Sequence, residues 1–360
     1  MLRSVLKTGC AGALSWTGAG DLLGRISRSR YRPLVVGYHR VVEDFDSEAK
    51  RSIPAQLTSL RTLEHQLDWI GRRCQFLPPD ELGEGLESGR QFRRPVALVT
   101  FDDGYQDVYT HAFPLLKRKG IPALVFVVTE SIDAARGLDH DALYTLLGRE
   151  FSEGECTLEA LNRLLAPSRV PPLRNFRPGS GTLGRFAATR ILLETLPQEA
   201  LRRLLDSRGA NPEKAPGSQG GAALMTWPML REMSEAGITI GSHSATHPLL
   251  TQESRERVGR ELVESRRRIS RRLQASIRHF AYPDGGFDVG VVREVAAAGY
   301  RFGYTVCRHL DPFFPLLTIP RKMLWEKSCL DALGRFSPAV MSCQANGIFD
   351  FASPCRRAHA

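Results

Sequence analysis

The feature that most constrains the fold is a series of short apolar runs spaced along the chain after residue 33. Most of them are continuous rather than alternating, which is typical of parallel strands covered on both faces. They occupy residues 34–38, 96–101, 123–128, 238–241, 279–282, 302–306 and 316–319. Helical patterns lie between them, for example an apolar stripe over residues 251–274. Repeated strand–helix units with right-handed crossovers predict a parallel barrel.

The domain organisation is predicted from breaks in this rhythm. Residues 131–224 hold apolar helical stretches and Pro/Gly-rich segments, so we predict a mostly helical insertion within a barrel of residues 33–336. Residues 1–32 are predicted to be a weakly amphipathic, basic extension. This extension is either solvated or lies as a helix on an anionic membrane surface. Residues 337–360 are predicted to be a helical or coiled tail.

Composition narrows the class of protein. In 360 residues, 42% are hydrophobic and 24% charged, as in a globular chain with a core. The net charge of +10 suits an acidic glycan or an anionic membrane face, and no nucleic acid is expected because no aromatic interleaving or known module accompanies the charge. The 7 cysteines are scattered, which disfavours a disulfide scaffold and a cysteine zinc site. Without a long apolar run or a clear secretory leader, we predict a cytoplasmic location, peripheral at the inner membrane face.

Polar side chains follow many of the apolar runs directly. Because the carboxyl ends of parallel barrel strands build one site, we expect these side chains to meet there. The residues that follow strands in this way are His39, Asp102 with Asp103, His243, Asp284 and Arg321.

Asp102 and Asp103 are adjacent carboxylates at the end of the run 96–101. Side chains alternate along a strand, so the two point to different sides. One can bind a metal while the other, close to that cation, stays ionised and acts as a base. The alternative is an Asx-type turn with a helix N-cap.

His243 and His247 lie four residues apart on the turn after another run, so both imidazoles can reach one ion. Such pairs also occur by chance. Together with an aspartate from a neighbouring strand they would form a His₂-Asp site with open positions for water and substrate. A third element, residues 282–285, is either a bare turn or a turn that presents backbone N–H groups to an oxyanion.

With these elements in this order, the chain resembles the polysaccharide deacetylases (the NodB-homology group, carbohydrate esterase family 4). The resemblance covers roughly residues 33–325, and it implies a distorted (β/α)7 barrel, with the insertion as an addition. It also implies a divalent metal, usually Zn²⁺, held by Asp103, His243 and His247. The motifs that carry it are TFDDG at 100–104, HSATH at 243–247, AYPDG at 281–285 and LVVGYH at 34–39.

The resemblance further implies a hydrolase that acts on carbon–nitrogen bonds other than peptide bonds. Its substrate would be an amino-sugar polysaccharide or a glycan precursor. Asp102 would take a proton from the metal-bound water, which attacks an N-acetyl carbonyl. The metal and the backbone N–H of Asp284 would stabilise the oxyanion, and acetate and an amine would leave.

Two departures from the family pattern affect the site residues. The arginine that in many members pairs with the catalytic aspartate is replaced here by Ala281. Arg278 lies three residues earlier on the strand, about 10 Å away, and is not expected to reach the aspartate. We therefore predict that Arg321 pairs with Asp102. The late histidine segment that supplies the general acid has no clear counterpart. His39 and His309 are the candidates, although His39 can equally be a hydrogen-bonded packing residue.

Two other functions stay open. One is a de-N-acylase or deformylase of a small or lipid-linked amino sugar. The other is a non-catalytic barrel that binds glycan, against which the intact set of Asp102, Asp103, His243 and His247 argues.

Overall fold

The strands of this protein form a parallel barrel. The computed structural model describes residues 2–17, 33–133, 137–151, 156–168, 172–173, 182–210, 223–307 and 309–349. The strands of the barrel are β1 (Leu34–Tyr38), β4 (Gln75–Phe76), β5 (Val96–Phe101), β6 (Ala123–Val127), β7 (Thr239–Ser242), β8 (His279–Ala281), β9 (Phe302–Thr305), β10 (Ile319–Pro320) and β11 (Lys322–Met323). Within the described residues they make a 9-stranded sheet in the order β10-β9-β8-β7-β6-β5-β1-β11, with β4 beside β5. A separate pair joins β2 (Arg40–Val42) to β3 (Leu57–Ser59).

The barrel closes almost completely at Arg321. This residue alone separates β10 from β11, the two strands at opposite ends of the sheet order. Its backbone N–H donates to the Thr305 carbonyl on β9, and the N–H of Leu324 donates to the Gly37 carbonyl on β1. The chain therefore steps from one edge of the sheet to the other across a single residue. The predicted distorted barrel is confirmed.

The continuous apolar runs form strands because both faces of the sheet are covered. Val35, Leu98 and Phe126 pack with Tyr304 inside the barrel. Alternate residues such as Val99 face outward to the helices. The outer helices are α4 (Leu60–Gly71), α5 (Pro79–Glu87), α6 (Phe113–Lys119), α11 (Trp227–Glu235), α12 (Arg255–Leu273) and α13 (Val289–Ala297), and a short helix α3 (Phe45–Glu48) precedes β3.

Two predicted boundaries were wrong, each for a local reason. The helix expected from residue 251 begins at Arg255, because the Ser254 side chain caps its first turn. The strand expected over 316–319 is largely a 3₁₀ turn, Pro315–Leu317, followed by the short β10. Pro315 favours the start of a helical turn because its φ is fixed near the helical value.

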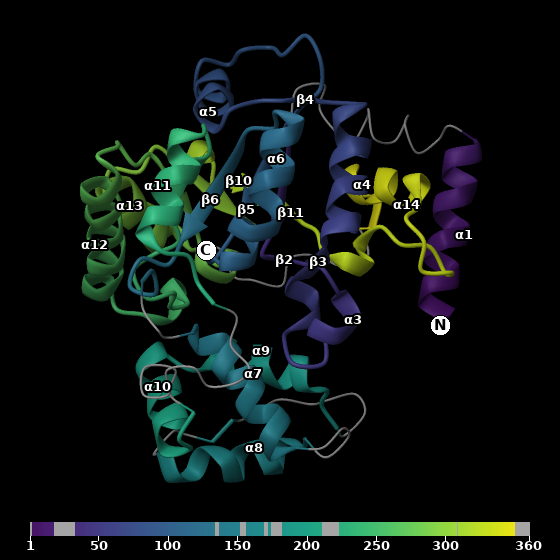
Figure 1. The fold of residues 1–360 in the computed structure, drawn as a ribbon. Coiled ribbons are helices and arrows are strands. Elements are labelled where there is room, and N and C mark those ends of the chain that lie inside the picture. The colour runs from purple at the N-terminus through teal and green to yellow at the C-terminus, as the bar shows by residue number, and fades with distance from the viewer. Residues whose placement is uncertain are drawn as a thin grey trace.

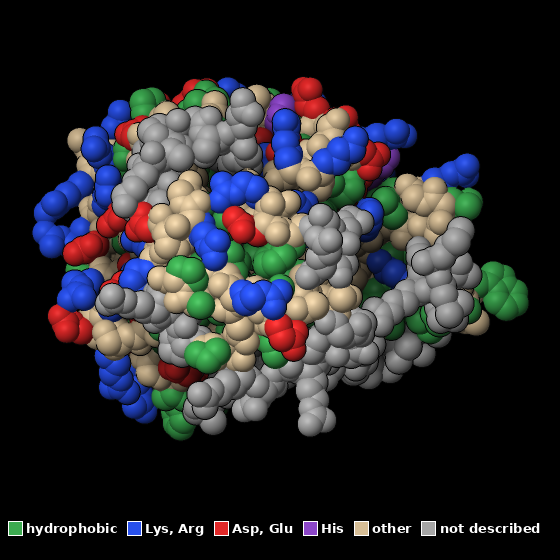
Figure 2. All heavy atoms as spheres, turned by 90° about the horizontal axis from the view of Figure 1, so that it is seen from below, with side chains coloured by type: hydrophobic (Ala, Val, Ile, Leu, Met, Phe, Trp, Pro, Cys, Tyr) green, Lys and Arg blue, Asp and Glu red, His purple; other side chains and the backbone are tan. Residues whose placement is uncertain are grey.

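Between β6 and β7 the chain forms a mostly helical layer of its own, which lies below the barrel in Figure 1. It consists of α7 (Asp139–Glu150), α8 (Leu158–Leu165), α9 (Arg185–Thr195) and α10 (Gln198–Ser207). A separate core that includes Leu147, Leu161 and Leu192 holds these helices together. On this side of the molecule, Lys and Arg side chains are interspersed with Asp and Glu and form no single basic patch among the described residues (Figure 2). The limits of the predicted domains stay predictions.

The N-terminal helix α1 (Leu2–Trp16) is docked on the helix α14 (Pro338–Ala345), as Figure 1 shows. Ala11 is fully buried against α14, and Lys7 Nζ donates to the Ser328 carbonyl at 2.6 Å. Helix α1 is therefore partly covered by α14 rather than solvated on all sides, because its small residues allow close packing. Contact of the extension with a membrane stays a prediction. The basic cluster at 25–30 and the end of the predicted tail lie outside the described residues. No helix within the described part of the chain has the length and apolar character to cross a membrane.

Candidate active site and metal centre

The two aspartates after β5 point to different partners, as their alternation predicts. Asp102 lies toward Arg321, and Asp103 lies toward His243 and His247. Asp103 has a positive φ of 73°, and Gly104 follows at 83°. A left-handed conformation is rare for a residue other than glycine, and such strain persists where the surroundings enforce it. The sharp exit from β5 thus turns the second carboxylate into the site.

The histidines come from the loop after β7. His243 Nε2 and His247 Nε2 lie 3.5 Å and 3.3 Å from Asp103 Oδ1. One ligand atom from each of the three residues falls within 4.8 Å of the others. His243 Nδ1 lies 2.8 Å from the Ala281 carbonyl, so this nitrogen carries the proton and donates. The lone pair of Nε2 is then aimed at the site, as in metal-ligating histidines.

A buried acid holds this loop in place. Glu261 on α12 is 6% exposed. Its carboxylate accepts from the backbone N–H groups of Ala245 and Thr246 at 3.0 Å and 2.8 Å, and from the Thr246 hydroxyl at 2.6 Å. The two histidines are thereby positioned by a residue on the outer helix.

The environment of the three residues fits a divalent cation. Both oxygens of Asp103 are buried and, among the described residues, accept no hydrogen bond. A buried carboxylate without donors is costly unless a cation compensates it. Two imidazoles and one carboxylate are ligands that zinc accepts, and they leave coordination positions open.

The protonation states of Asp103 and His243 agree with ligand roles. Burial lowers the pKa of His243 to about 4, so its imidazole is neutral at pH 7. Burial also opposes the charged form of His247, but the neighbouring Asp103 outweighs it and raises the pKa of that histidine. For Asp103 burial opposes ionisation, yet the pKa of the carboxyl is lowered because His247 and other histidines lie close. Metal binding requires an ionised carboxylate and neutral imidazoles. Asp103 and His243 are in that form, whereas His247 would give up its proton when a cation binds.

Arg321 pairs with Asp102 through two parallel hydrogen bonds, so the predicted contact is present. The Nη1–Oδ1 and Nη2–Oδ2 distances are 2.6 Å and 2.8 Å, and Nη1 also donates to Thr100 Oγ1 at 3.1 Å. Both side chains are buried. Burial opposes ionisation of Asp102, but the Arg321 charge outweighs it and lowers the pKa of the carboxyl. Arg278 pairs instead with Glu84 on α5, as its distance along the strand predicted.

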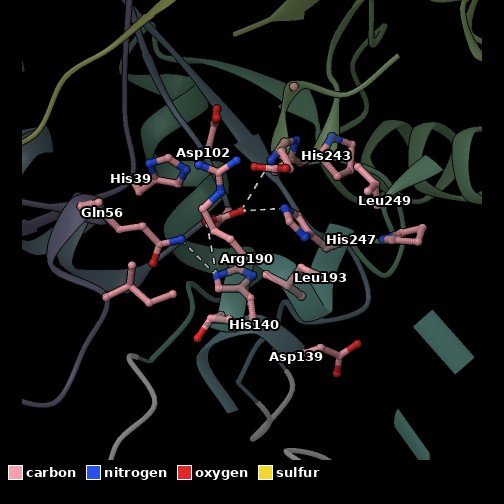
Figure 3. A pocket seen from close by; sticks show the side chains of 18 of the residues that line it. His39, Gln56, Asp102, Asp139, His140, Arg190, Leu193, His243, His247 and Leu249 are labelled. Carbon is pink, nitrogen blue, oxygen red and sulfur yellow. Dashed lines mark hydrogen bonds and ion pairs between the residues drawn. The ribbon is translucent and has the colours of Figure 1, made fainter. Parts of the chain in front are cut away.

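His39 and Asp284 border the same cavity as Asp103, His243 and His247. Figure 3 shows His39 near Asp102. His39 follows β1, and Asp284 lies in the turn after β8 with a φ of 53°. The next residue must be small, because a Cβ on Gly285 would approach Val306 Cγ2 to 2.2 Å. The roles assigned to His39 and to the Asp284 amide stay predictions. His309 is exposed and does not border this cavity, so it is not the general acid of this site.

Sequence reasoning missed the contribution of the helical insertion to the site. His140, in the first turn of α7, lies 3.9 Å from Asp103 Oδ2 through its Nε2 atom. The same nitrogen lies 2.9 Å from the Tyr105 hydroxyl, which donates to Asp141 at 2.8 Å. The polar triplet Asp139–Asp141 at the start of an apolar helix was the available signal.

The cavity over Asp103, His243 and His247 has a volume of about 250 Å³. Its floor is formed by the strand ends of the barrel, and the insertion forms part of its wall through α7, α9 and α10. Figure 3 shows His39, Gln56, His140, Leu193 and Leu249 around Asp102, His243 and His247. Both apolar and polar side chains line this concave site, and the carboxylates and imidazoles converge at its base, as in many small-molecule sites.

Comparison with known proteins assigns the family. Residues 89–160 and 209–303 match the model described as polysaccharide deacetylase. The chain belongs to the polysaccharide deacetylase family. The matched residues contain the metal-site motifs of this chain, whereas residues 161–208, which hold α9 and α10, fall between the two matched segments.

Relatives and solved structures agree with this assignment. The chain is 32% identical over 107 residues to the poly-beta-1,6-N-acetyl-D-glucosamine N-deacetylase of Staphylococcus epidermidis, over 28% of this chain. The alignment spans 37% of the length of the curated relatives that the chain matches. The fold is similar to IcaB from Ammonifex degensii, with a TM-score of 0.54 and 18% identity over 88% of this chain and 97% of that chain. It is also similar to the Streptococcus pyogenes deacetylase PplD in complex with acetate, with a TM-score of 0.53 and 17% identity over 83% and 95% of the two chains.

Proposed function

We propose that this protein is a metal-dependent hydrolase that removes N-acetyl groups from the amino sugars of a polysaccharide or its precursor. The observation that carries the proposal is the convergence of Asp103, His243 and His247 at the base of one cavity, with Asp102 beside them. Family membership and the name of the Staphylococcus epidermidis relative support the same reaction.

The proposed roles follow from chemistry and position. Asp103, His243 and His247 would hold a divalent cation, and Zn²⁺ suits these ligands best. Such a cation would polarise the acyl oxygen and lower the pKa of water.

Asp102 is the proposed base. Its pair with Arg321 keeps it ionised and oriented, so it can accept the proton of the water that adds to the amide carbon. The backbone N–H of Asp284 would donate to the developing oxyanion. His39 is assigned as the group that gives a proton to the leaving nitrogen as the C–N bond breaks. The products are acetate and a free amine.

A second part of the proposal concerns where the protein acts, and it rests on the net charge of +10 and the N-terminal helix. A cytoplasmic location with peripheral contact at the inner membrane face stays a prediction, as does the absence of a nucleic-acid partner.

The test combines metal analysis with acetate release. Purified wild-type protein should hold close to one equivalent of a divalent metal and release acetate from at least one of chitin oligomers, peptidoglycan fragments or exopolysaccharide. Asp102→Asn should keep the metal, and its rate of acetate release should fall by about 10²–10⁴-fold. The surface variant Asp46→Asn, on the exposed side of α3, is the matched control and should keep wild-type rates. Tight metal binding without acetate release from any amino-sugar polymer would instead support a non-catalytic glycan-binding barrel.

A further inference from the structure

Helix α9 of the insertion presents two large apolar side chains, Phe186 and Leu193, to the cavity, with the polar Thr189 and Arg190 between them. Phe186, Thr189, Arg190 and Leu193 all line it, and their spacing of three and four residues places them on one side of the helix. The other side carries Leu192, which is buried in the separate core of the insertion. Leu193 also packs at the edge of that core, whereas packing within the insertion does not explain Phe186, which borders the cavity outside that core.

The barrel side of the cavity is apolar in the same region. Pro248 and Leu249 follow the metal ligand His247, and Val306 follows β9. Phe186 and Val306 are 40% and 36% exposed, and both belong to the short set of large exposed hydrophobic residues in the described part of the chain. Two such side chains at one cavity, next to further leucines, form the kind of apolar surface that marks a binding groove.

This wall is an addition to the family's catalytic parts. Helix α9 falls between the two segments that match the family model. The next helix, α10, ties the insertion to the site. Its first residue, Gln198, donates to the Thr246 carbonyl at 2.6 Å and to Asp139 at 2.9 Å. The wall thus has a defined position over the loop that carries His243 and His247.

We propose that the substrate is an amino sugar that carries an apolar chain, and that this chain lies between α9 and the Leu249–Val306 side of the cavity. This inference rests on the proposed function and names its substrate class. Sugar hydroxyls placed against such a wall would lose hydrogen bonds to water, whereas a hydrocarbon chain gains free energy when it leaves water. Because these apolar side chains and the candidate metal site line one cavity, a single molecule can place its amide at the site and its chain against the wall.

The test measures binding, so that it does not depend on turnover. The probes are alkyl β-glycosides of N-acetylglucosamine with methyl, hexyl and octyl chains, used below their micelle concentrations. Calorimetry with the Asp102→Asn protein should show affinity that rises with chain length, by about tenfold or more from methyl to octyl. The upper limit is about fourfold per methylene, since a buried CH₂ contributes about 0.8 kcal/mol and 1.36 kcal/mol is tenfold.

Variants locate the effect on the wall. Phe186→Ser and Leu193→Ser, each in the Asp102→Asn background, should remove most of the chain-length dependence while methyl-glycoside binding is retained. Phe313→Ser is the matched control, because Phe313 is 85% exposed and does not line the cavity. If Leu193→Ser unfolds the insertion, the exposed Phe186 position still decides the matter.

A second arm distinguishes where the chain is attached. Methyl glycosides with N-hexanoyl or N-octanoyl groups place the chain on nitrogen, so a length effect limited to this arm would identify a long-chain de-N-acylase. Affinity that is independent of chain length in both arms, or a length effect that survives both serine variants, overturns the inference. Acetate release from a polymer without any length effect would leave the proposed function standing and remove the apolar chain. A chain-length effect on affinity without acetate release from any substrate would support the apolar chain and remove the proposed function.

Discussion

The buried pair between Arg321 and Asp102 gives the sharpest test of how the barrel seam supports the site. Replacing Arg321 by Met leaves the Asp102 carboxylate buried with its two strongest donors removed, and both side chains are buried in the intact pair. Breaking a buried pair by removing one partner lowers the free energy of unfolding by about 3–5 kcal/mol, because the remaining charge is uncompensated. Arg278→Met is the matched control. It breaks an ion pair with Glu84 in which the side chains are 35% and 53% exposed, and such pairs contribute about 0–1 kcal/mol.

The measurement is a double-mutant cycle by urea unfolding at pH 7 with a chelator present, so that bound metal does not contribute. Asp102→Asn combined with Arg321→Met removes the uncompensated charge, so the double variant should be more stable than the sum of the single effects predicts. We expect a coupling free energy of about 2 kcal/mol or more. Coupling below about 0.5 kcal/mol, or equal losses for Arg321→Met and Arg278→Met, would refute the reasoning. Unchanged m-values are needed for the comparison, because they show that the unfolded states are alike.

Three further predictions concern the metal site and its supports. Glu261→Ala should weaken zinc binding by about 10–100-fold in calorimetric titration, because the loop with both histidines loses the hydrogen bonds to the Glu261 carboxylate. The control variant Glu264→Ala, at an exposed position of the same helix, should bind zinc as the wild type does. Tyr105→Phe should lower the free energy of unfolding by about 1–3 kcal/mol, because the buried His140 and Asp141 both lose their contact with the hydroxyl. Tyr109→Phe is the control and should change the free energy of unfolding little, because the Tyr109 hydroxyl bond is exposed. Zinc at about 100 times its Kd should stabilise the wild type by about 2.7 kcal/mol in thermal unfolding. Asp103→Asn should lose most of that stabilisation, and an equal gain in both proteins would place the metal elsewhere.

The contact between Arg321 and Asp102 shows how far sequence reasoning reached. It was expected because both residues follow apolar runs, and strands of a parallel barrel end at one rim. The reason for the bidentate geometry lies in the strand order, since β10 and β11 are the two edges that Arg321 joins. That closure depends on pairing between residues far apart along the chain, which the residues near 321 do not reveal.

His140 and the side of the cavity formed by α9 show where reasoning from the sequence failed. His140 approaches Asp103 only because α7 packs over the rim of the barrel, and Tyr105 and Gln198 hold the insertion there. Helix α9 has apolar residues on two sides, and in the sequence both sides look like ordinary core positions. Which side faces a cavity is set by the packing of α9 against its own layer.

The amino-acid sequence by itself determined the parallel barrel, the family and the set Asp102, Asp103, His243 and His247, because strand periodicity and motif spacing are local properties of the chain. The tertiary structure alone decided that the insertion borders the candidate metal site, that Phe186 and Leu193 of α9 line the cavity and that α1 docks on α14. Those arrangements arise from contacts between segments distant in sequence, whose free energies no local pattern records.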